Sequence, residues 1–168
     1  MNTKEREQFT CCLTGHRYLP PEVLPDLKKK LEAVLEKLIQ GGCNFGAGGA
    51  LGFDTMAAEL VLKMKEKYPV YLILVLPCRD QAMRRPDNEK RRYEAIREKA
   101  DKVVFICEQY TSGCMHRRNR QFVDRSICVA YCTRESGGSA ETVRYARRKG
   151  LRVINLQRGF VNCTQSCS

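Results

Sequence analysis

"VYLILVLP", residues 70–77, is a continuous apolar run. It predicts one strand of the fold, and the segments on either side of it predict the elements next to that strand. A strand that helices cover on both faces has no alternation of polar and apolar residues, so this run is typical of a central strand in a parallel sheet. The preceding segment, 53–68, has apolar residues at helical spacing, and the following segment, 88–100, has the pattern of a charged helix. Residues 70–77 are therefore predicted to form a strand between two helices.

The same alternation of strand-like and helical segments continues in both directions along the chain. Further strands are predicted over 9–15, at the start of 44–52, and over 102–107, 127–132 and 151–156, with further helices over 23–39 and 139–150. Strands that alternate with helices favour a parallel sheet with right-handed crossovers. The sequence thus predicts an α/β fold, a Rossmann-like three-layer sandwich with a mainly parallel sheet of about six strands.

The length and the hydropathy of the chain predict one globular domain. The 168 residues suit a single core, assigned to 1–158, and the polar segment 159–168 is predicted to be a C-terminal tail. The sequence has no run of eighteen apolar residues and no signal-peptide core at the N-terminus. We therefore expect a cytoplasmic protein with no membrane partner, and a homo-oligomer is left open.

The balance of charge favours an anionic partner. The net charge of +11 fits a nucleotide, a nucleic acid or an acidic lipid, although a basic surface that serves only solubility is the alternative. "CMHRRNRQFVDRS", residues 114–126, is strongly basic, with only Asp124 opposing. At the mouth of a cleft this segment would bind an anion, and elsewhere it would be a solvated face.

The ten cysteines do not predict disulfides or a metal site. Six of them lie in or beside strand-like runs and are expected to be small buried hydrophobic residues in a reducing compartment, namely Cys11, Cys12, Cys78, Cys107, Cys128 and Cys132. No C-x-x-C pair occurs, and the two histidines do not complete a metal-ligand spacing. Neither a metal nor a cofactor is therefore predicted.

The first candidate binding residues follow the first predicted strand. In parallel α/β sheets, ligands bind beyond the carboxyl ends of the strands, where the strand order reverses. The first strand ends in "TGHR", residues 14–17. Gly15 would let a phosphate approach the backbone, and His16 and Arg17 would project toward it, with the guanidinium able to make two parallel hydrogen bonds.

The second strand ends in "GAGGALGFD", residues 46–54. Gly48 and Gly49 are predicted to expose backbone N–H groups to an anion at the start of the next helix. Asp54 lies in the first turn of that helix, where it would accept hydrogen bonds from ribose hydroxyls. Complementing the helix dipole or capping the helix is an equally weighted alternative for Asp54.

Two further loops carry candidate residues. Gly137, Gly138 and Ser139 form a second glycine-rich helix N-terminus, and Arg79 follows the strand at 70–77. The basic segment adds a further pair of candidates, Arg118 and Asn119, whereas the cations near the end of the last helix fit a solvated face better. We expect the loops after the first, second, third and fifth strands to meet at one pocket, because all of them leave the same edge of a parallel sheet.

Four segments together resemble the signatures of the YpsA-like branch of the SLOG superfamily. They are "TGHR" (14–17), "GGALGFDTMAAE" (48–59), "GCMHRRNRQFVDRS" (113–126) and "GGSAETVRYARRKGL" (137–151). Their order and spacing match, and they extend over nearly the whole chain. The resemblance implies a Rossmann-like fold that binds nucleotides or nucleotide-derived ligands. The superfamily includes the Lonely Guy phosphoribohydrolases and the single-strand DNA-binding DNA-processing protein A.

The resemblance also bears on catalysis. The enzyme branch of the superfamily carries P-G-G-x-G-T-x-x-E, in which the glutamate is catalytic. In this chain the two leading glycines match, Ala140 replaces the third glycine, and Arg144 stands at the position of the glutamate. Glu141 and Asp54 are the remaining weak candidates for a catalytic carboxylate. The match implies that phosphate binding is kept and that the catalytic half of the motif is not.

Three functions from different classes follow from these features. The first hypothesis is a protein that binds a nucleotide or a nucleotide-derived small molecule in a sensing, sequestering or regulatory role. The second is an enzyme that hydrolyses an N-glycosidic or phosphoribosyl bond of a nucleotide. The third is single-stranded nucleic-acid binding, which the charge favours and the scarcity of aromatic residues (8%) disfavours.

Overall fold

The computed structural model describes residues 10–109, 111, 113, 117 and 127–158. Helices and strands alternate along them as the sequence predicts. They are β1 (Thr10–Gly15), α2 (Leu24–Gln40), β2 (Asn44–Ala47), α3 (Phe53–Met64), β3 (Leu72–Cys78), α4 (Asp87–Lys99), β4 (Lys102–Cys107), β5 (Ile127–Tyr131), α6 (Gly138–Arg148), β6 (Arg152–Asn155) and a 3-10 turn, η1 (Leu156–Arg158). The predicted tail, 159–168, lies outside the described residues, so the domain boundary at 158 stays a prediction.

The strands form one sheet, and its order locates the reversal of the chain. The order is β4-β3-β2-β1-β5-β6, and every pairing is parallel. The chain moves outward from β1 to β4 and then returns to the other side of β1 with β5. The reversal therefore lies between β1 and β5, whose ends are level because Gly15 pairs with Tyr131. The Rossmann-like α/β fold predicted from the sequence is confirmed.

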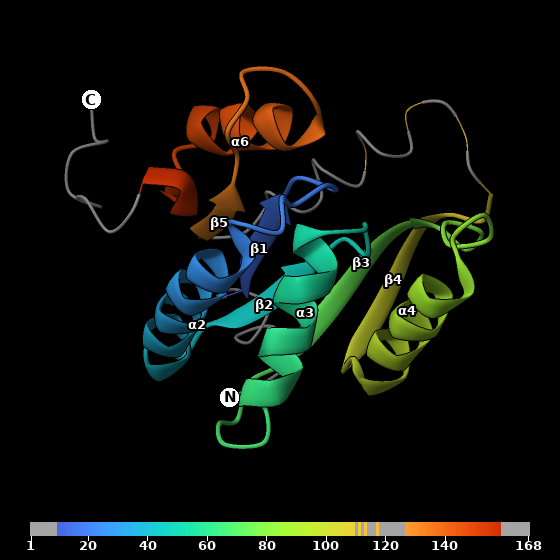
Figure 1. The fold of residues 1–168 in the computed structure, drawn as a ribbon, viewed down its shortest axis with the longest axis horizontal. Coiled ribbons are helices and arrows are strands. Elements are labelled where there is room, and N and C mark those ends of the chain that lie inside the picture. The colour runs from blue at the N-terminus through green and yellow to red at the C-terminus, as the bar shows by residue number, and fades with distance from the viewer. Residues whose placement is uncertain (1–9, 110, 112, 114–116, 118–126, 159–168) are drawn as a thin grey trace.

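The sheet has a hydrophobic core on each face, so the sheet and the helices that cover it form three layers (Figure 1). In β3, Leu72, Leu74 and Leu76 belong to the core shared with α2, α3 and α4, whereas Ile73 and Val75 belong to the core shared with α6. Successive residues of a strand point to opposite faces of the sheet, so a continuous apolar run supplies both cores at once. This is the physical reason why residues 70–77 could be predicted as a central strand.

Small side chains bring α6 close to the sheet. Ala140, Val143 and Ala146 pack against Cys12 and Cys128 on neighbouring strands, and Ala146 is fully buried. Five of the six strand cysteines named from the sequence are buried, Cys107 is partly buried, and all six are free thiols. The five buried ones act as small apolar residues in the core, as predicted, whereas the sulfur of Cys107 accepts a hydrogen bond from the Arg117 guanidinium. No helix in the described part of the chain is long and apolar enough to cross a membrane.

The start of α3 is tightly joined to the end of β1. A Cβ atom added at Gly15 would overlap the ring of Phe53, and one added at Gly52 (φ 76°) would overlap the carbonyl of Arg17. The backbone N–H of Phe53 also donates to the carbonyl oxygen of His16 over 3.0 Å. Gly15 and Gly52 are thus required by packing within the protein, and they fix the loop after β1 against the first turn of α3.

Candidate functional site

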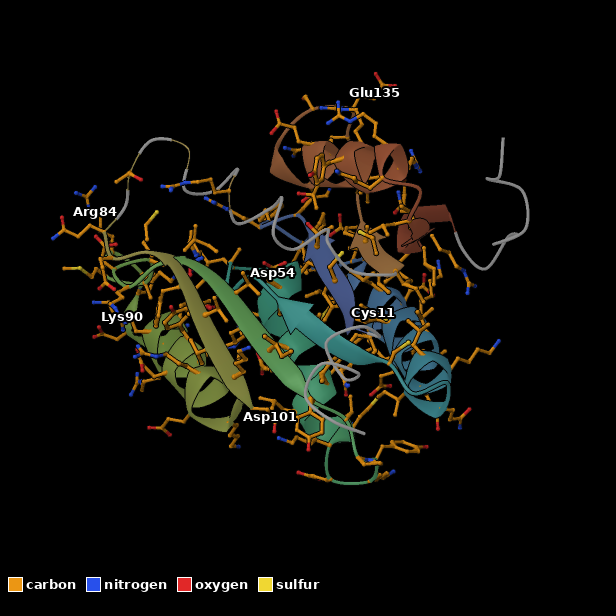
Figure 2. The ribbon with its side chains drawn as sticks, turned by 180° about the vertical axis from the view of Figure 1, so that it is seen from behind. Cys11, Asp54, Arg84, Lys90, Asp101 and Glu135 are labelled. Carbon is orange, nitrogen blue, oxygen red and sulfur yellow. The ribbon has the colours of Figure 1, made fainter. Side chains whose placement is uncertain are left out.

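A pocket of about 590 Å³ opens at the carboxyl end of the sheet, where the strand order reverses. This volume is within the range of small-molecule sites. We call it the switch-point pocket, and it is lined by Thr14, Gly15, His16, Arg17, Tyr18, Ala50, Asp54, Arg134, Ser136, Gly137, Gly138, Ser139, Glu141 and Thr142. Figure 2 shows Asp54 at this end of the sheet and Asp101 at the opposite end. The position agrees with the rule for ligand sites in open parallel sheets.

Most of the site residues predicted from the sequence meet at this pocket. Those that line it are Gly15, His16, Arg17, Asp54, Gly137, Gly138, Ser139 and Glu141. Gly48, Gly49 and Arg79 are not among the lining residues, and Arg118 and Asn119 lie outside the described residues. The loops after β1, β2 and β5 and the first turns of α3 and α6 therefore line the pocket, and the loop after β3, which was expected to join them, does not.

The N-terminus of α6 is the part of the pocket best suited to a phosphate. The first N–H groups of a helix have no partner within the helix, and the helix dipole favours negative charge there. No side chain in the described part of the chain caps α6, which begins at Gly138 after Gly137. Gly137 needs its positive φ of 102°, but Gly138 does not have a positive φ, and a Cβ atom at either residue would meet nothing within 4 Å. The space beside Gly138 is therefore open to a ligand.

His16 connects the two loops at the reversal of the chain. Its Nε2 accepts a hydrogen bond from the backbone N–H of Thr133 over 2.8 Å and lies 3.0 Å from the Thr133 hydroxyl. An acceptor Nε2 places the proton of the neutral ring on Nδ1. Burial, and then the nearby charge of Arg134, lower the pKa of His16 below its ordinary value. The ring, edge-on to Tyr131, thus holds the loops after β1 and β5 together in its neutral form.

Gly48 and Gly49 are not among the lining residues, and their carbonyl groups accept hydrogen bonds from the segment after β3. Gln81 Nε2 donates to the Gly48 carbonyl over 3.3 Å, and a guanidinium nitrogen of Arg85 donates to the Gly49 carbonyl over 2.8 Å. Gly49 has a φ of 72°, and a side chain there would overlap Leu76. These two residues are therefore anchored to the segment after β3, whereas Ala50 of the same loop lines the pocket.

Asp54 lies where either of the roles that the sequence left open is possible, in the first turn of α3 and at the pocket, and its side chain does not cap the helix. It lines the pocket, yet only 6% of its surface is exposed. Its carboxylate accepts a hydrogen bond from the Ala50 N–H over 3.3 Å, and the Thr55 hydroxyl donates to the Ala50 carbonyl over 2.8 Å. Asp54 thus closes the glycine-rich turn at the start of α3 while it faces the pocket.

Arg79 is directed away from the switch-point pocket. Its Nε lies 2.7 Å from a carboxylate oxygen of Glu108, and its guanidinium lies 4.2 Å from the ring centroid of Phe105. The predicted third strand also extends beyond Pro77 to Cys78, so the following loop begins later than the sequence indicated. Arg79 therefore belongs to the surface over β4.

Three exposed lining residues were not predicted from the sequence, namely Tyr18, Arg134 and Ser136. Each lies within a few residues of a predicted site residue. Applying the rule that ligands bind beyond the carboxyl ends of the strands to the whole of each loop would have found them. Arg134 adds a second exposed guanidinium beside Arg17, and Tyr18 is an exposed aromatic ring at the pocket. Among the described residues, no group of three or more His, Cys, Asp or Glu side chains could hold a metal ion.

Arg144, at the position of the enzymes' glutamate, has a structural partner. One of its guanidinium nitrogens donates to the carbonyl of Glu135, in the loop that leads into α6. Figure 2 shows Glu135 at the outer side of this loop. Glu141 lines the pocket and is exposed. Position 144 is therefore used to hold the loop before α6, and Glu141 is the carboxylate that α6 brings to the pocket.

Both the sequence and the fold of this chain resemble known proteins. The model of the YspA SLOG family (YpsA) matches residues 22–148. A UPF0398 protein of Oceanobacillus iheyensis is 32% identical over 119 residues, which are 68% of this chain and 65% of that protein. The chain thus spans slightly less than two thirds of this curated relative.

Two solved structures resemble the fold. DNA processing protein A from Helicobacter pylori, described for its single-stranded DNA binding mode, superposes with a TM-score of 0.66 at 20% identity, over 90% of this chain and 67% of that one. DNA processing protein A from Streptococcus pneumoniae superposes with a TM-score of 0.65 at 19% identity, over 86% of this chain and 48% of that one. At these identities the likeness concerns the fold.

Proposed function

Because the chain belongs to the YspA SLOG family, we propose that it binds a nucleotide or a nucleotide-derived small molecule in the switch-point pocket. The phosphate of this ligand lies against the backbone at Gly138 and Ser139, at the N-terminus of α6. Arg17 and Arg134 add positive charge, and Asp54 accepts hydrogen bonds from the ribose. A cytoplasmic sensing, sequestering or regulatory role is part of the same proposal.

The open space at Gly138 is the observation that carries this proposal. Packing within the protein explains Gly15, Gly49 and Gly52, because an added Cβ atom at each would overlap a neighbouring group. Nothing within 4 Å explains a glycine at 138, and its backbone does not require one. A ligand that approaches the first N–H groups of α6 gives the missing reason, and a phosphate is the group that such a site favours.

Hydrolysis of the ligand's N-glycosidic bond is the second candidate function. The exposed carboxylate of Glu141 in the pocket favours it, since a carboxylate can stabilise an oxocarbenium-like centre. Arg144, bound to the carbonyl of Glu135, stands where the related enzymes carry their glutamate. We therefore expect binding without release of free base.

Single-stranded nucleic-acid binding is the third candidate. The net charge of +11 supports it, as does the likeness of the fold to DNA processing protein A. A mononucleotide and an oligonucleotide share phosphate chemistry, so the size of the ligand must be measured. Arg118 and Asn119 stay predicted ligand contacts in either case.

The test uses two glycine variants at positions where an added Cβ atom overlaps no neighbouring group. Gly138→Val places a side chain in open space beside the proposed phosphate, and Gly41→Val places one at the end of α2, where an added Cβ meets two carbonyl oxygens at 3.4 and 3.7 Å. Loss of the hydrogen bonds to the phosphate should weaken binding by roughly 1.5–3 kcal/mol, which is about a ten- to hundredfold loss of affinity. Isothermal titration with four nucleoside monophosphates and ribose 5-phosphate measures it.

We expect Gly138→Val to weaken binding of every phosphorylated ligand while its melting temperature stays close to that of Gly41→Val. Equal affinities of Gly138→Val and the unchanged protein would contradict the phosphate site. The same samples, analysed by chromatography for free base, separate binding from hydrolysis. Rapid release of base that Glu141→Gln abolishes would favour the enzyme instead.

A further inference from the structure

Tyr18 is unusual among the apolar side chains of this protein. Its exposed fraction is 71%, and Met83 (70%) is the other large apolar side chain exposed among the described residues. Tyr18 lines the switch-point pocket, whereas Met83 does not. A single exposed aromatic residue needs no explanation by itself. Its position beside a charged pocket is what gives it significance.

The surroundings of Tyr18 fit one end of an elongated ligand. Tyr18 follows Arg17 on the loop after β1, and Arg134 enters the pocket from the loop after β5. The open N-terminus of α6, with Gly138, lies across the reversal from the β1 loop. The pocket therefore has an anion-binding part on α6 and an exposed aromatic ring on the opposite loop.

The backbone that carries Tyr18 is fixed before any ligand binds. The nearby His16 ring accepts a hydrogen bond from Thr133, the His16 carbonyl accepts one from the Phe53 N–H, and the Arg17 carbonyl packs closely against Gly52. A rigid backbone lowers the entropy that must be lost when a side chain is ordered on a ligand. Tyrosine itself has few rotatable bonds, so it is suited to such a contact.

We infer that Tyr18 stacks on the base of the bound nucleotide, and that the ligand is therefore a nucleoside phosphate, not a phosphorylated sugar alone. This inference rests on the proposed function, since it takes the phosphate to lie at α6. Stacking tolerates any base because every base presents a π-face. The site thus distinguishes a ligand with a base from one without it, and distinguishes less among the four bases.

The experiment compares ligands with and without a base in matched variants. Adenosine, guanosine, cytidine and uridine monophosphates and ribose 5-phosphate are titrated into the unchanged protein and into Tyr18→Ala, Tyr18→Phe and Met83→Ala. We expect Tyr18→Ala to weaken the tightest monophosphate by about five- to a hundredfold and to leave ribose 5-phosphate unchanged. Tyr18→Phe keeps an aromatic ring and should keep the affinity for the monophosphate. Met83→Ala should leave the affinity for both kinds of ligand unchanged.

Four outcomes would overturn the inference, and they show whether the proposed function falls with it. Tyr18→Ala could leave the affinity for monophosphates unchanged, or it could weaken the binding of monophosphates and ribose 5-phosphate equally. Either result would contradict stacking by Tyr18 but not the proposed phosphate site. Equal affinity of the unchanged protein for ribose 5-phosphate and for every monophosphate, with loss of both in Gly138→Val, has the same consequence. Absence of binding for all these ligands removes the proposed function together with the inference.

Discussion

At the scale of single residues, His16 makes the pocket sensitive to pH. Its pKa is lower in the folded protein than the ordinary value of 6.5, chiefly because of burial. In the pH range between these two values the unfolded chain binds more protons than the folded one. The free energy of unfolding is therefore unaffected above about pH 6.5 and falls as the pH drops through this range. Protonation would also place an N–H of His16 against the Thr133 N–H that now donates to it.

We predict that His16→Gln flattens this pH dependence, because its amide oxygen reaches the position of Nε2 and can accept from the Thr133 N–H without titrating. Urea denaturation between about pH 5 and pH 7 measures the slope. The other histidine, His116, is present in both proteins, so its contribution cancels in the comparison. An identical slope for the two proteins would show that His16 keeps its ordinary pKa.

At the scale of whole elements, α6 depends on small residues for its distance from the sheet. Ala146 is fully buried in the core that contains Cys12, Cys128 and Ala130. Ala146→Leu would add three carbon atoms to a filled space, which commonly costs about 1–3 kcal/mol. We predict a lower melting temperature and, because α6 also carries Gly138, a weaker affinity for nucleoside monophosphates. Thermal unfolding and isothermal titration check the two effects.

Arg147→Leu is the matched control, since Arg147 is the exposed neighbour on the same helix. It adds an apolar side chain without entering the core, so both stability and affinity should stay close to those of the unchanged protein. Loss of stability without loss of affinity in Ala146→Leu would mean that the N-terminus of α6 keeps its place when the rest of the helix shifts.

The elements could be predicted from the sequence because their determinants are local. The apolar run at 70–77 and the helical spacing at 53–68 each depend on residues within a few positions of one another. The role of Gly48 and Gly49 could not be predicted in this way. Their carbonyls bind Gln81 and Arg85, more than thirty residues later, and only the folded chain shows that pairing. The rule that ligands bind beyond the carboxyl ends of the strands therefore predicted where the pocket lies, but not which nearby residues line it.

At the scale of the whole molecule, the net charge of +11 must be separated from the site. Arg147, Arg148 and Lys149 are exposed at the carboxyl end of α6, and the proposed phosphate site is at the other end. Eleven helical residues span about 16 Å, which exceeds the Debye length of about 8 Å at physiological salt. Replacing all three by alanine lowers the net charge by three, from +11 to +8. A phosphate held at α6 should barely respond to this change.

We therefore predict that this triple variant keeps its affinity for nucleoside monophosphates to within about twofold, whereas Arg17→Ala loses about ten- to a hundredfold. An oligonucleotide that binds the basic surface diffusely would behave differently. Its affinity would fall in the triple variant. The slope of log affinity against log salt concentration would also become shallower, by about 0.7 for each phosphate that the protein no longer neutralises. Titrations at about 50 mM and about 200 mM salt with both ligands compare the two cases. If the triple variant and Arg17→Ala weaken monophosphate binding equally, the charge acts as a general field and Arg17 has no special place in the pocket.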